Sequence, residues 1–593
     1  MSPKPASEFR RGVKRLRMGH HLSFFRKHEE YYVYHDLWGY LLAMDRQPLE
    51  LLRAFGPQGR AIAEVQAEFS GRLRPEQIES YLATFRSHGC LVPLRHDERS
   101  EAFARGHPVR APWTVAWLSG RQAGEAAEQQ ARQGVLAYRD RALGRVVLQR
   151  LGEFEARLFE LCDGERTLAE LAELLAPHAG GPEAARHAVA RFVFSLTHSY
   201  RQVLKLLDRP RYTYLSLLPA YVRSSMPFAR LEEAELQELP APAPSRDVVD
   251  LSAYHREGIA DAAAQFDLEE TTLSHMFREP HPALGGRSYG EAFAQALLER
   301  NLVPRQGEVV EVGGGVGFFA LRLLETLERL APAHYAGLRY TTLDLSAVLQ
   351  ESQRLLTSAL GAKVRHVLAD ASRGLPLRDA SAALVLSNEV IADLETVRLR
   401  RRELEAGAPP AGAPPSIRAA HALLGRYGIG WQDAPEVFWL NLGALRLVEE
   451  IARVLRPGGA AVLTEFGALD RYPIESTHLE HGEFSIHFGH LIQLARAVGL
   501  QVEHTDIIEF LGMRTQVPVL ATTRSHFLCL RALLQRRGVS LQKLAYSREQ
   551  FEALCRERID PGEIEGLRFL PAGERVLGLR PREFQVLILR RPA

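Results

Sequence analysis

Strand-like apolar runs alternate with amphipathic helical patterns through the second half of the chain. Residues 318–330, for example, repeat apolar positions at helical spacing directly behind one such run. Strands that alternate with helices favour a parallel sheet built from crossover units. We therefore expect a doubly wound α/β domain over 251–593 with an insertion at 398–445, whose Pro/Gly/Ala-rich stretch 406–415 is either disordered or part of a substrate lid. The strand-like runs lie at 309–312, 338–344, 364–370, 382–386 and 460–467.

The first half of the chain carries another pattern twice, a strand followed by three helices and a closing strand. This order predicts two small α+β winged-helix domains at 29–100 and 130–210, after a basic extension at 1–28 and before a Pro/Ala linker within 211–250. The first copy has its segments at 31–37, 49–55, 62–69, 74–85 and 88–94. The second has them at 133–138, 153–164, 167–175, 183–196 and 202–207.

A glycine-rich turn follows the first apolar run of the second half. Gly313, Gly315 and Gly317 permit a sharp turn and let a ligand approach the backbone without a Cβ in the way. The dinucleotide fingerprint G-x-G-x-x-G would need its third glycine at position 318, which is Phe. The spacing is therefore typical of an S-adenosylmethionine loop in class I methyltransferases, which have a Rossmann-like fold, rather than of an NAD loop.

Polar residues recur where the predicted strands end, which is where open α/β sheets bind ligands. Asp344 ends the second strand, where a ribose diol is normally held, although it could instead cap the next helix. Asp370 ends the third strand, where an adenine amino group is usually met, and Asn388 and Glu389 follow the fourth. The predicted cofactor-binding residues are Glu311, Gly313, Gly315, Gly317, Asp344, Asp370, Ala371 and Asn388.

The segments 311–317, 387–389 and 485–488 together resemble MidA-type methyltransferases, which include the arginine methyltransferases of the complex I assembly-factor type. The resemblance covers roughly 255–593 and implies S-adenosylmethionine as cofactor. It also implies catalytic roles for His487 and for the strand-end carboxylates, which could fix the plane of a guanidinium acceptor. The sequence departs from the family by lacking a proline after Asn-Glu and by having Glu465-Phe466-Gly467 where the family often has Asp-Tyr-Gly. The predicted catalytic residues are Glu389, Glu465 and His487.

The segment 161–171 resembles the PqqD-type fold, which recurs as a precursor-recognition element in enzymes that modify ribosomally made peptides. Such a module implies that a leader peptide adds to an exposed strand edge. Two alternatives remain, namely packing or dimerisation alone, and DNA binding through a recognition helix. The acids Glu76, Glu79 and Glu183 in the third helices disfavour a DNA reader.

Composition narrows the remaining choices. The four cysteines are scattered without a C-x-x-C, which argues for a reducing compartment and against a structural zinc site, and we expect no metal. The net charge of +2 and the absence of a long apolar run favour neither nucleic acid nor a membrane as a partner. The abundance of Arg, Ala, Leu and Gly suggests a bacterial source, and we expect a cytoplasmic protein that could form a homodimer.

The leading hypothesis is a methyltransferase that modifies a ribosomally synthesised precursor peptide and recognises its leader through the N-terminal PqqD-like domains. Arginine N-methylation is the favoured chemistry, with carboxylate or hydroxyl O-methylation of a peptide close behind. One alternative is a protein arginine methyltransferase that acts on a folded partner, with the N-terminal half as an assembly module. Another is a scaffold that binds S-adenosylmethionine without turnover.

Overall fold

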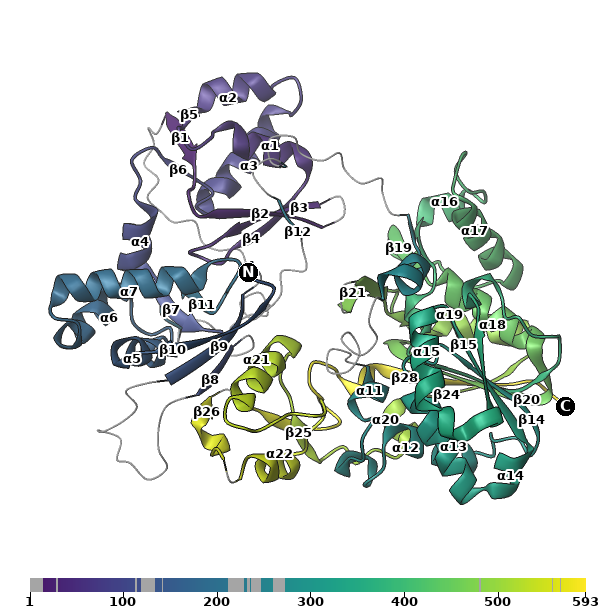
Figure 1. Ribbon diagram of the computed structural model, residues 1–593. Helices are drawn as coiled ribbons and strands as arrows, with labels where there is room; N and C mark the ends of the chain where they lie inside the picture. Colours follow the sequence, from purple (N-terminus) through teal and green to yellow (C-terminus); the bar gives the residue numbers. More distant parts are fainter. Residues whose placement is uncertain are drawn as a thin grey trace. The chain divides into compact units, whose positions relative to one another are not determined.

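The chain folds into two compact units, and segments from the C-terminal half contribute to both (Figure 1). The smaller unit comprises 1–245 with 525–540 and 555–567, and the larger comprises 246–524 with 541–554 and 568–593. The computed structural model describes residues 14–27, 30–111, 115–118, 134–140, 142–211, 229–231, 235, 247–259, 272–478, 481–556, 558–565 and 567–593.

An eight-stranded sheet forms the centre of the larger unit. Its order is β16-β15-β14-β17-β20-β28-β24, with the short β23 (Ile486–His487) pairing beside β20. The first five of these strands run parallel, whereas β28 is antiparallel to both of its neighbours. The five predicted strands are confirmed, and the structure adds β24 and β28 to the same sheet. The bounds are β14 (Gly307–Val312), β15 (Leu338–Asp344), β16 (Val364–Leu368), β17 (Ala382–Asn388), β20 (Leu455–Ala468), β24 (Gln501–Asp506) and β28 (Phe584–Arg590).

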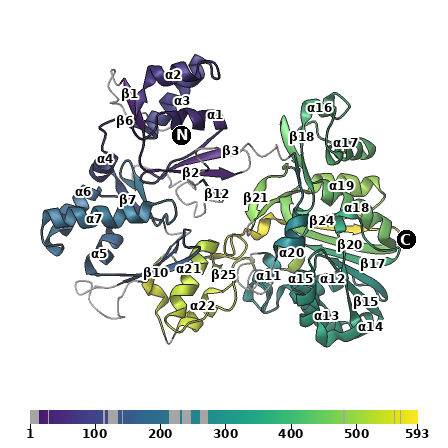
Figure 2. The same cartoon turned by 45° about the horizontal axis from the view of Figure 1, so that its top comes forward.

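Helices cover both faces of this sheet, as the strand–helix alternation predicts. Figure 2 shows α18 (Leu442–Val454) and α19 (Phe488–Ala497) on one side and α13 (Phe318–Leu330) on the other. All seven residues of β17 are buried, which explains why 382–386 form a continuous apolar run rather than an alternating pattern. The carboxyl ends of the parallel strands therefore meet at one edge of a fully covered sheet. Further helices of this unit are α12 (Tyr289–Glu299), α14 (Pro332–Gly337), α15 (Ala347–Leu356) and α20 (Ile507–Leu511).

The predicted insertion forms a small subdomain instead of an unstructured loop. β18 (Thr396–Arg400) and β19 (Val437–Leu440) pair antiparallel, and α16 (Arg401–Glu405) and α17 (Pro415–Tyr427) lie between them in the chain. Within the Pro/Gly/Ala-rich stretch, Ala413 is buried and joins the main core. A hairpin of β21 (Glu475–His478) and β22 (His481–Phe484) follows β20.

The smaller unit contains the two predicted repeats, and each opens with a three-stranded antiparallel meander. In both copies an earlier strand pairs antiparallel with the closing strand, β1 (Arg15–Met18) with β6 (Leu91–Pro93) and β7 (His107–Arg110) with β11 (Leu204–Leu207). The first copy has β2 (Leu22–Lys27), β3 (Glu30–His35), β4 (Leu41–Met44), α1 (Arg46–Ala54), α2 (Ile62–Phe69) and α3 (Pro75–Ser87). The second has β8 (Val115–Leu118), β9 (Gly134–Asp140), β10 (Arg145–Leu151), α5 (Glu153–Leu161), α6 (Leu168–Leu175) and α7 (Pro182–Thr197).

One feature of the domain organisation differs from the sequence prediction. Residues 251–593 were expected to form one domain, but 525–540 and 555–567 fold with the N-terminal unit. The reason is that α21 (Arg524–Gln535) buries most of its side chains, and β26 (Ile564–Glu565) pairs antiparallel with β8. Between these segments, α22 (Arg548–Cys555) lies mostly in the larger unit, where β25 (Pro518–Leu520) also pairs with β27 (Phe569–Pro571).

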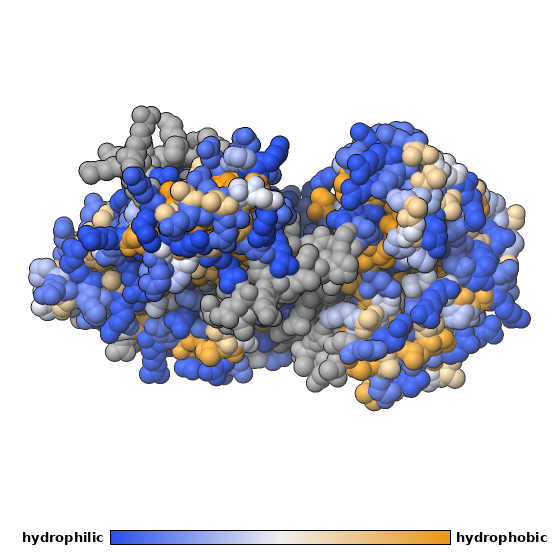
Figure 3. All heavy atoms as spheres, turned by 90° about the horizontal axis from the view of Figure 1, so that it is seen from above, coloured by the Kyte–Doolittle hydropathy of each residue, from blue (hydrophilic) through white to orange (hydrophobic). Residues whose placement is uncertain are grey.

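The surface gives no sign of a membrane span in the part of the chain that the structure describes, because no helix there is both long and apolar enough to cross a bilayer. The face drawn in Figure 3 is mostly hydrophilic, with apolar side chains in small scattered groups.

Candidate functional site

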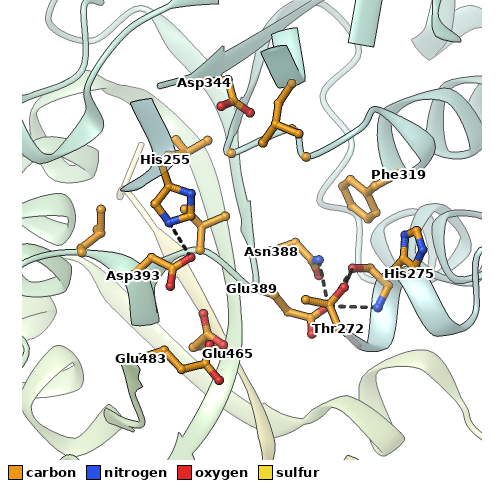
Figure 4. Close-up of a pocket in the computed structure, with 18 of the residues that line it drawn as sticks. His255, Thr272, His275, Phe319, Asp344, Asn388, Glu389, Asp393, Glu465 and Glu483 are labelled. Carbon is orange, nitrogen blue, oxygen red and sulfur yellow. Dashed lines mark hydrogen bonds and ion pairs between the residues drawn. The ribbon is translucent and has the colours of Figure 1, made fainter. Parts of the chain in front are cut away.

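A cavity of about 620 Å³ lies at the carboxyl ends of the central strands of the larger unit. The glycine loop after β14, the end of β15 and the segments after β16, β17 and β20 all line it. Figure 4 shows its polar side chains, with Asp344 on one side and Glu465 and Glu483 on another. The strand-end residues singled out in the sequence therefore meet around one space.

The glycine loop turns as the sequence predicts, and its glycines are required for different reasons. Gly313 has φ +76°, and a Cβ there would lie 2.3 Å from a methyl carbon of Val390. Gly317 has φ +97° and begins α13 as its N-cap residue. Gly315 has φ +51°, and no atom lies within 4 Å of where its Cβ would be. The loop thus needs positive φ at 313, 315 and 317, and at Gly315 it faces open space.

Two buried carboxyl groups flank this loop. The hydroxyl of Tyr340 donates to Glu311 Oε2 over 3.1 Å, and burial raises the pKa of Glu311 to about 8. Asp344 accepts from the Ser346 amide at 2.9 Å and from Gln353 Nε2 at 2.8 Å, and burial raises its pKa as well. Because Ser346 itself caps α15, Asp344 is not needed as the helix cap and remains suited to hold a diol.

The raised pKa of Glu311 makes a prediction about stability without cofactor. Between pH 4.5, the usual pKa of such a group, and about 8, the folded protein holds a proton that the unfolded chain has lost. The free energy of unfolding therefore falls as pH rises through this window. Near pH 5 we expect Glu311→Gln and wild type to have almost the same free energy of unfolding. Near pH 9 the free energy of unfolding of the variant should exceed that of wild type by on the order of 2–4 kcal/mol. Denaturant unfolding across this range measures the difference, and parallel pH profiles would contradict the assignment.

Asp370 is held by neighbours from two sides at the predicted adenine position. It accepts from the Ser372 amide at 3.0 Å, and it pairs with Arg256 at 3.1 Å and with Arg373 at 3.4 Å. Ala371 follows it and also lines the cavity. Asp370 therefore provides a polar group at this part of the cavity, and the small side chain of Ala371 lies next to it.

Asn388 and Glu389 stand at the end of β17, in the centre of the cavity wall (Figure 4). The Asn388 side-chain oxygen accepts from the hydroxyls of Tyr289 and Thr464, each at 2.7 Å. Glu389 has φ +55°, a strained conformation for a residue with a side chain. Its carboxylate accepts from the amides of 273 and 274 at 2.8 and 3.0 Å, at the start of α11 (Leu273–Met276). Both carboxylate oxygens of Glu389 thus accept hydrogen bonds from the start of α11 and position this helix beside the cavity.

A set of carboxyl groups surrounds Glu465 near the end of β20. Glu465 is 2% exposed and accepts from the Ala392 amide at 3.2 Å. Burial raises its pKa well above the usual value, and the charges of Glu483 and Glu389 raise it further. Asp393, which follows β17, adds to the same effect. These surroundings favour the protonated form of Glu465, and a bound cation would favour its ionised form.

His487 does not line the main cavity, which differs from the sequence expectation. It lies in a separate cavity of about 310 Å³ with Asp433 and His490. Its ring stacks on His490 with centroids 3.7 Å apart, and its Nδ1 accepts from the His490 amide, which makes it the N-cap of α19. In the structure His487 acts as a helix cap outside the main cavity, and the catalytic role implied by resemblance stays a prediction. The side chains of 478 and 481 lie outside the described residues, among which no group of His, Cys, Asp or Glu is placed to hold a metal ion.

Sequence reasoning missed several residues of the main cavity. His255 pairs with Asp393 at 3.2 Å, and both line the cavity (Figure 4). Glu483 comes from the β21–β22 hairpin, and Arg575 and Arg580 come from the segment before β28. None belongs to a local motif, so only the folded chain brings them to the strand ends. Tyr289 of α12 also reaches this wall, where its hydroxyl donates to the side-chain oxygen of Asn388.

Comparison with known proteins identifies the class of enzyme. Residues 290–480, about a third of the chain, match the sequence family described as putative S-adenosyl-L-methionine-dependent methyltransferase. No curated protein matches the chain. The match and the cavity at the strand ends agree, so the protein is an S-adenosylmethionine-dependent methyltransferase.

The solved structures that are similar to part of the chain include the following two. A Burkholderia thailandensis protein bound to S-adenosyl-homocysteine is 18% identical, with 60% of this chain and 92% of that chain covered and a TM-score of 0.34. A methyltransferase from Aquifex aeolicus is 13% identical, with 42% and 92% covered and a TM-score of 0.24.

The residues of the cavity fit this cofactor. Glu311 and Asp344 offer buried carboxyl groups near the glycine loop, and Asp370 offers a third acceptor at the next strand end. The open space in front of Gly315 leaves room for a ligand against the backbone. When bound, S-adenosylmethionine supplies an electrophilic methyl group to a nucleophile. The chain's part is to align the acceptor and exclude water.

Proposed function

We propose that this methyltransferase acts on a cationic nitrogen, the guanidinium of an arginine, in a ribosomally synthesised precursor peptide. The observation that carries the proposal is the acidic wall of the cavity beside the glycine loop. Carboxyl groups from three segments gather there, on Glu389, Asp393, Glu465 and Glu483. The resemblance of 311–317 and 387–389 to arginine methyltransferases supports the same chemistry.

The acidic wall separates the candidate acceptors by their charge. A carboxylate acceptor would enter a space already crowded by like charges, which costs binding free energy. A guanidinium would instead pair with the carboxylates through its planar fork of N–H donors. Glu465 would release its proton when the cation binds, and an ionised carboxylate beside the acceptor could later accept a proton from the methylated nitrogen. A neutral hydroxyl acceptor would gain no charge pairing from the wall.

Recognition of a leader peptide is proposed for the meanders of the smaller unit. In the first meander β2 pairs with β12 (Ala229–Arg230), and in the second β8 pairs with β26. Among the described strands, the opposite edges β4 and β10 have one partner each. An exposed strand edge is where an extended peptide adds by main-chain hydrogen bonds. β10 offers seven residues against four for β4, so we expect it to be the main site.

A pair of matched substitutions tests the choice of edge. Val147 packs against the core of the second repeat, which places Leu148, half-buried, on the opposite face of β10. Leu41 has the corresponding place on β4, beside the core-packed Leu42. We expect Leu148→Asp to weaken peptide binding at least about tenfold, because it puts a desolvated charge where apolar contact is needed. Leu41→Asp should change it little.

Fluorescence anisotropy of labelled precursor peptides on the full-length protein measures these affinities. Equal affinity for both variants and wild type would contradict recognition at the β10 edge. The whole chain is used because 525–540 and 555–567 fold with the N-terminal unit.

Methyl transfer tests the acceptor directly. Labelled S-adenosylmethionine is incubated with the full-length enzyme and a precursor peptide encoded beside it, or with the same peptide carrying Gln in place of each Arg. The proposal expects label only in the arginine peptide. Label retained in the glutamine peptide would favour O-methylation, and label only in a folded protein would favour the assembly-factor alternative.

A further inference from the structure

A short segment before the methyltransferase sheet forms part of the lining of the cofactor cavity. We call residues 247–259 the strap. Its residues Asp250, Ser252, Tyr254 and His255 line the cavity together with the glycine loop. The strap is therefore part of the wall around the cofactor, although it comes from outside the strand–helix alternation that predicts the fold.

The strap is held at its two ends. At the start, β13 (Val248–Val249) pairs antiparallel with β18, and the Arg398 amide donates to the carbonyl of Asp247 at 2.7 Å. At the far end, Ile259 is 3% exposed and packs with Leu349 of α15. Val316 of the glycine loop packs against the same small cluster. The strap thus reaches from the insertion subdomain to the loop that turns around the cofactor.

Two adjacent strap residues form ion pairs with the ends of two different strands. Arg256 pairs with Asp370 after β16 at 3.1 Å, and His255 contacts Asp393 after β17 at 3.2 Å. In the sheet, β15 and β14 lie between these two strands. The pairs therefore stand on opposite sides of the cofactor position, one at the predicted adenine site and one beside the acidic wall.

The middle of the strap is weakly anchored. Among its residues with a described side chain, Ile259 is the one that is buried, and 254–258 form a single turn of π-helix, a rare conformation that is frequent at functional sites. Arg256 is 43% exposed and His255 is 23% exposed, so each ion pair is partly screened by water. Few buried apolar contacts and exposed polar links are typical of elements that open locally.

We propose that the strap is a latch that closes over bound S-adenosylmethionine and opens for its exchange. The ion pairs Arg256–Asp370 and His255–Asp393 hold it closed. Because the second ion pair holds Asp393 at the acidic wall, closure over the cofactor also positions a carboxylate on the acceptor side of the cavity. The cofactor is then expected to bind before the acceptor.

Dissociation of the cofactor tests the latch. Full-length protein is loaded with tritiated S-adenosylmethionine and chased with excess S-adenosyl-homocysteine. A partly exposed ion pair contributes little, so Arg256→Gln and His255→Gln should each speed dissociation by about two- to fivefold, and the double variant by about tenfold. Arg373→Gln is the matched control, because Arg373 pairs with the same Asp370 carboxylate from outside the strap and is 79% exposed. It should leave the rate unchanged.

Hydrogen exchange on the wild-type protein gives a second readout. Amides of 248–258 should exchange more slowly when S-adenosylmethionine is bound, while those of β24 at the far edge of the sheet should not change. An unchanged dissociation rate in the double variant, or unchanged exchange in the strap, would show a fixed wall and overturn the latch. Both measurements use the cofactor alone, so they stand whether or not an arginine peptide is the acceptor.

Discussion

Replacing Gly315 with arginine should abolish binding of S-adenosylmethionine while the protein stays folded. The Cβ of residue 315 would face open space in front of the glycine loop, so the long side chain would fill the space that the cofactor needs. We expect the affinity for the cofactor to fall at least about a hundredfold. This loss is larger than the roughly 1–2 kcal/mol of backbone strain at a left-handed residue would produce by itself. Titration calorimetry measures the loss, and circular dichroism confirms the fold.

Gly361→Arg is the matched control for this change. Gly361 has φ +54°, close to the +51° of Gly315, and its Cβ would also meet no atom within 4 Å. It does not line the cavity. The control therefore places an arginine at another positive-φ glycine without blocking the site, and it should bind the cofactor like wild type. If Gly315→Arg bound S-adenosylmethionine as tightly as wild type, the glycine loop would not be part of the cofactor site.

Glu465→Gln should lower kcat/KM on an arginine peptide by roughly a hundredfold, because a buried carboxylate that pairs with a cation is replaced by a neutral amide. Cofactor affinity should change little. The pKa of Glu465 is raised by burial and by neighbouring carboxylates, so the group must lose a proton when the guanidinium binds. The wild-type KM should therefore fall as pH rises, and this dependence should weaken in the variant.

Steady-state kinetics between about pH 6 and 9 measure both effects. Glu503→Gln, a change at an exposed carboxylate on β24, is the control and should behave like wild type. An unchanged kcat/KM in Glu465→Gln would place the acceptor away from the acidic wall.

The sequence predicts the cofactor half of the site because its signals are local. A buried strand, a glycine turn and a strand-end Asp such as Asp344 each need only a few adjacent residues, and the sheet topology then brings them together. The strap and its ion pairs were missed because Arg256 and Asp370 are 114 residues apart. No spacing rule links such positions.

Two other differences have equally physical causes. The segments 525–540 and 555–567 fold with the N-terminal unit and not with the methyltransferase sheet. One link to that unit is the two-residue strand β26, which is too short to show a sequence pattern. His487 matched by resemblance alone, and in the fold its imidazole is used as a helix cap. The repeats in the first half were legible because helical periodicity and the capping box at Thr167 are again local signals.

The central claim is methylation of a peptide arginine, and tandem mass spectrometry tests it most directly. The full-length enzyme is co-expressed with candidate precursor peptides, and the fragment ions place any added mass. The account predicts a shift of roughly +14 Da on an arginine side chain, present with wild-type enzyme and absent with Gly315→Arg. The same shift on an aspartate, glutamate or serine side chain, or no shift on any peptide, would contradict it.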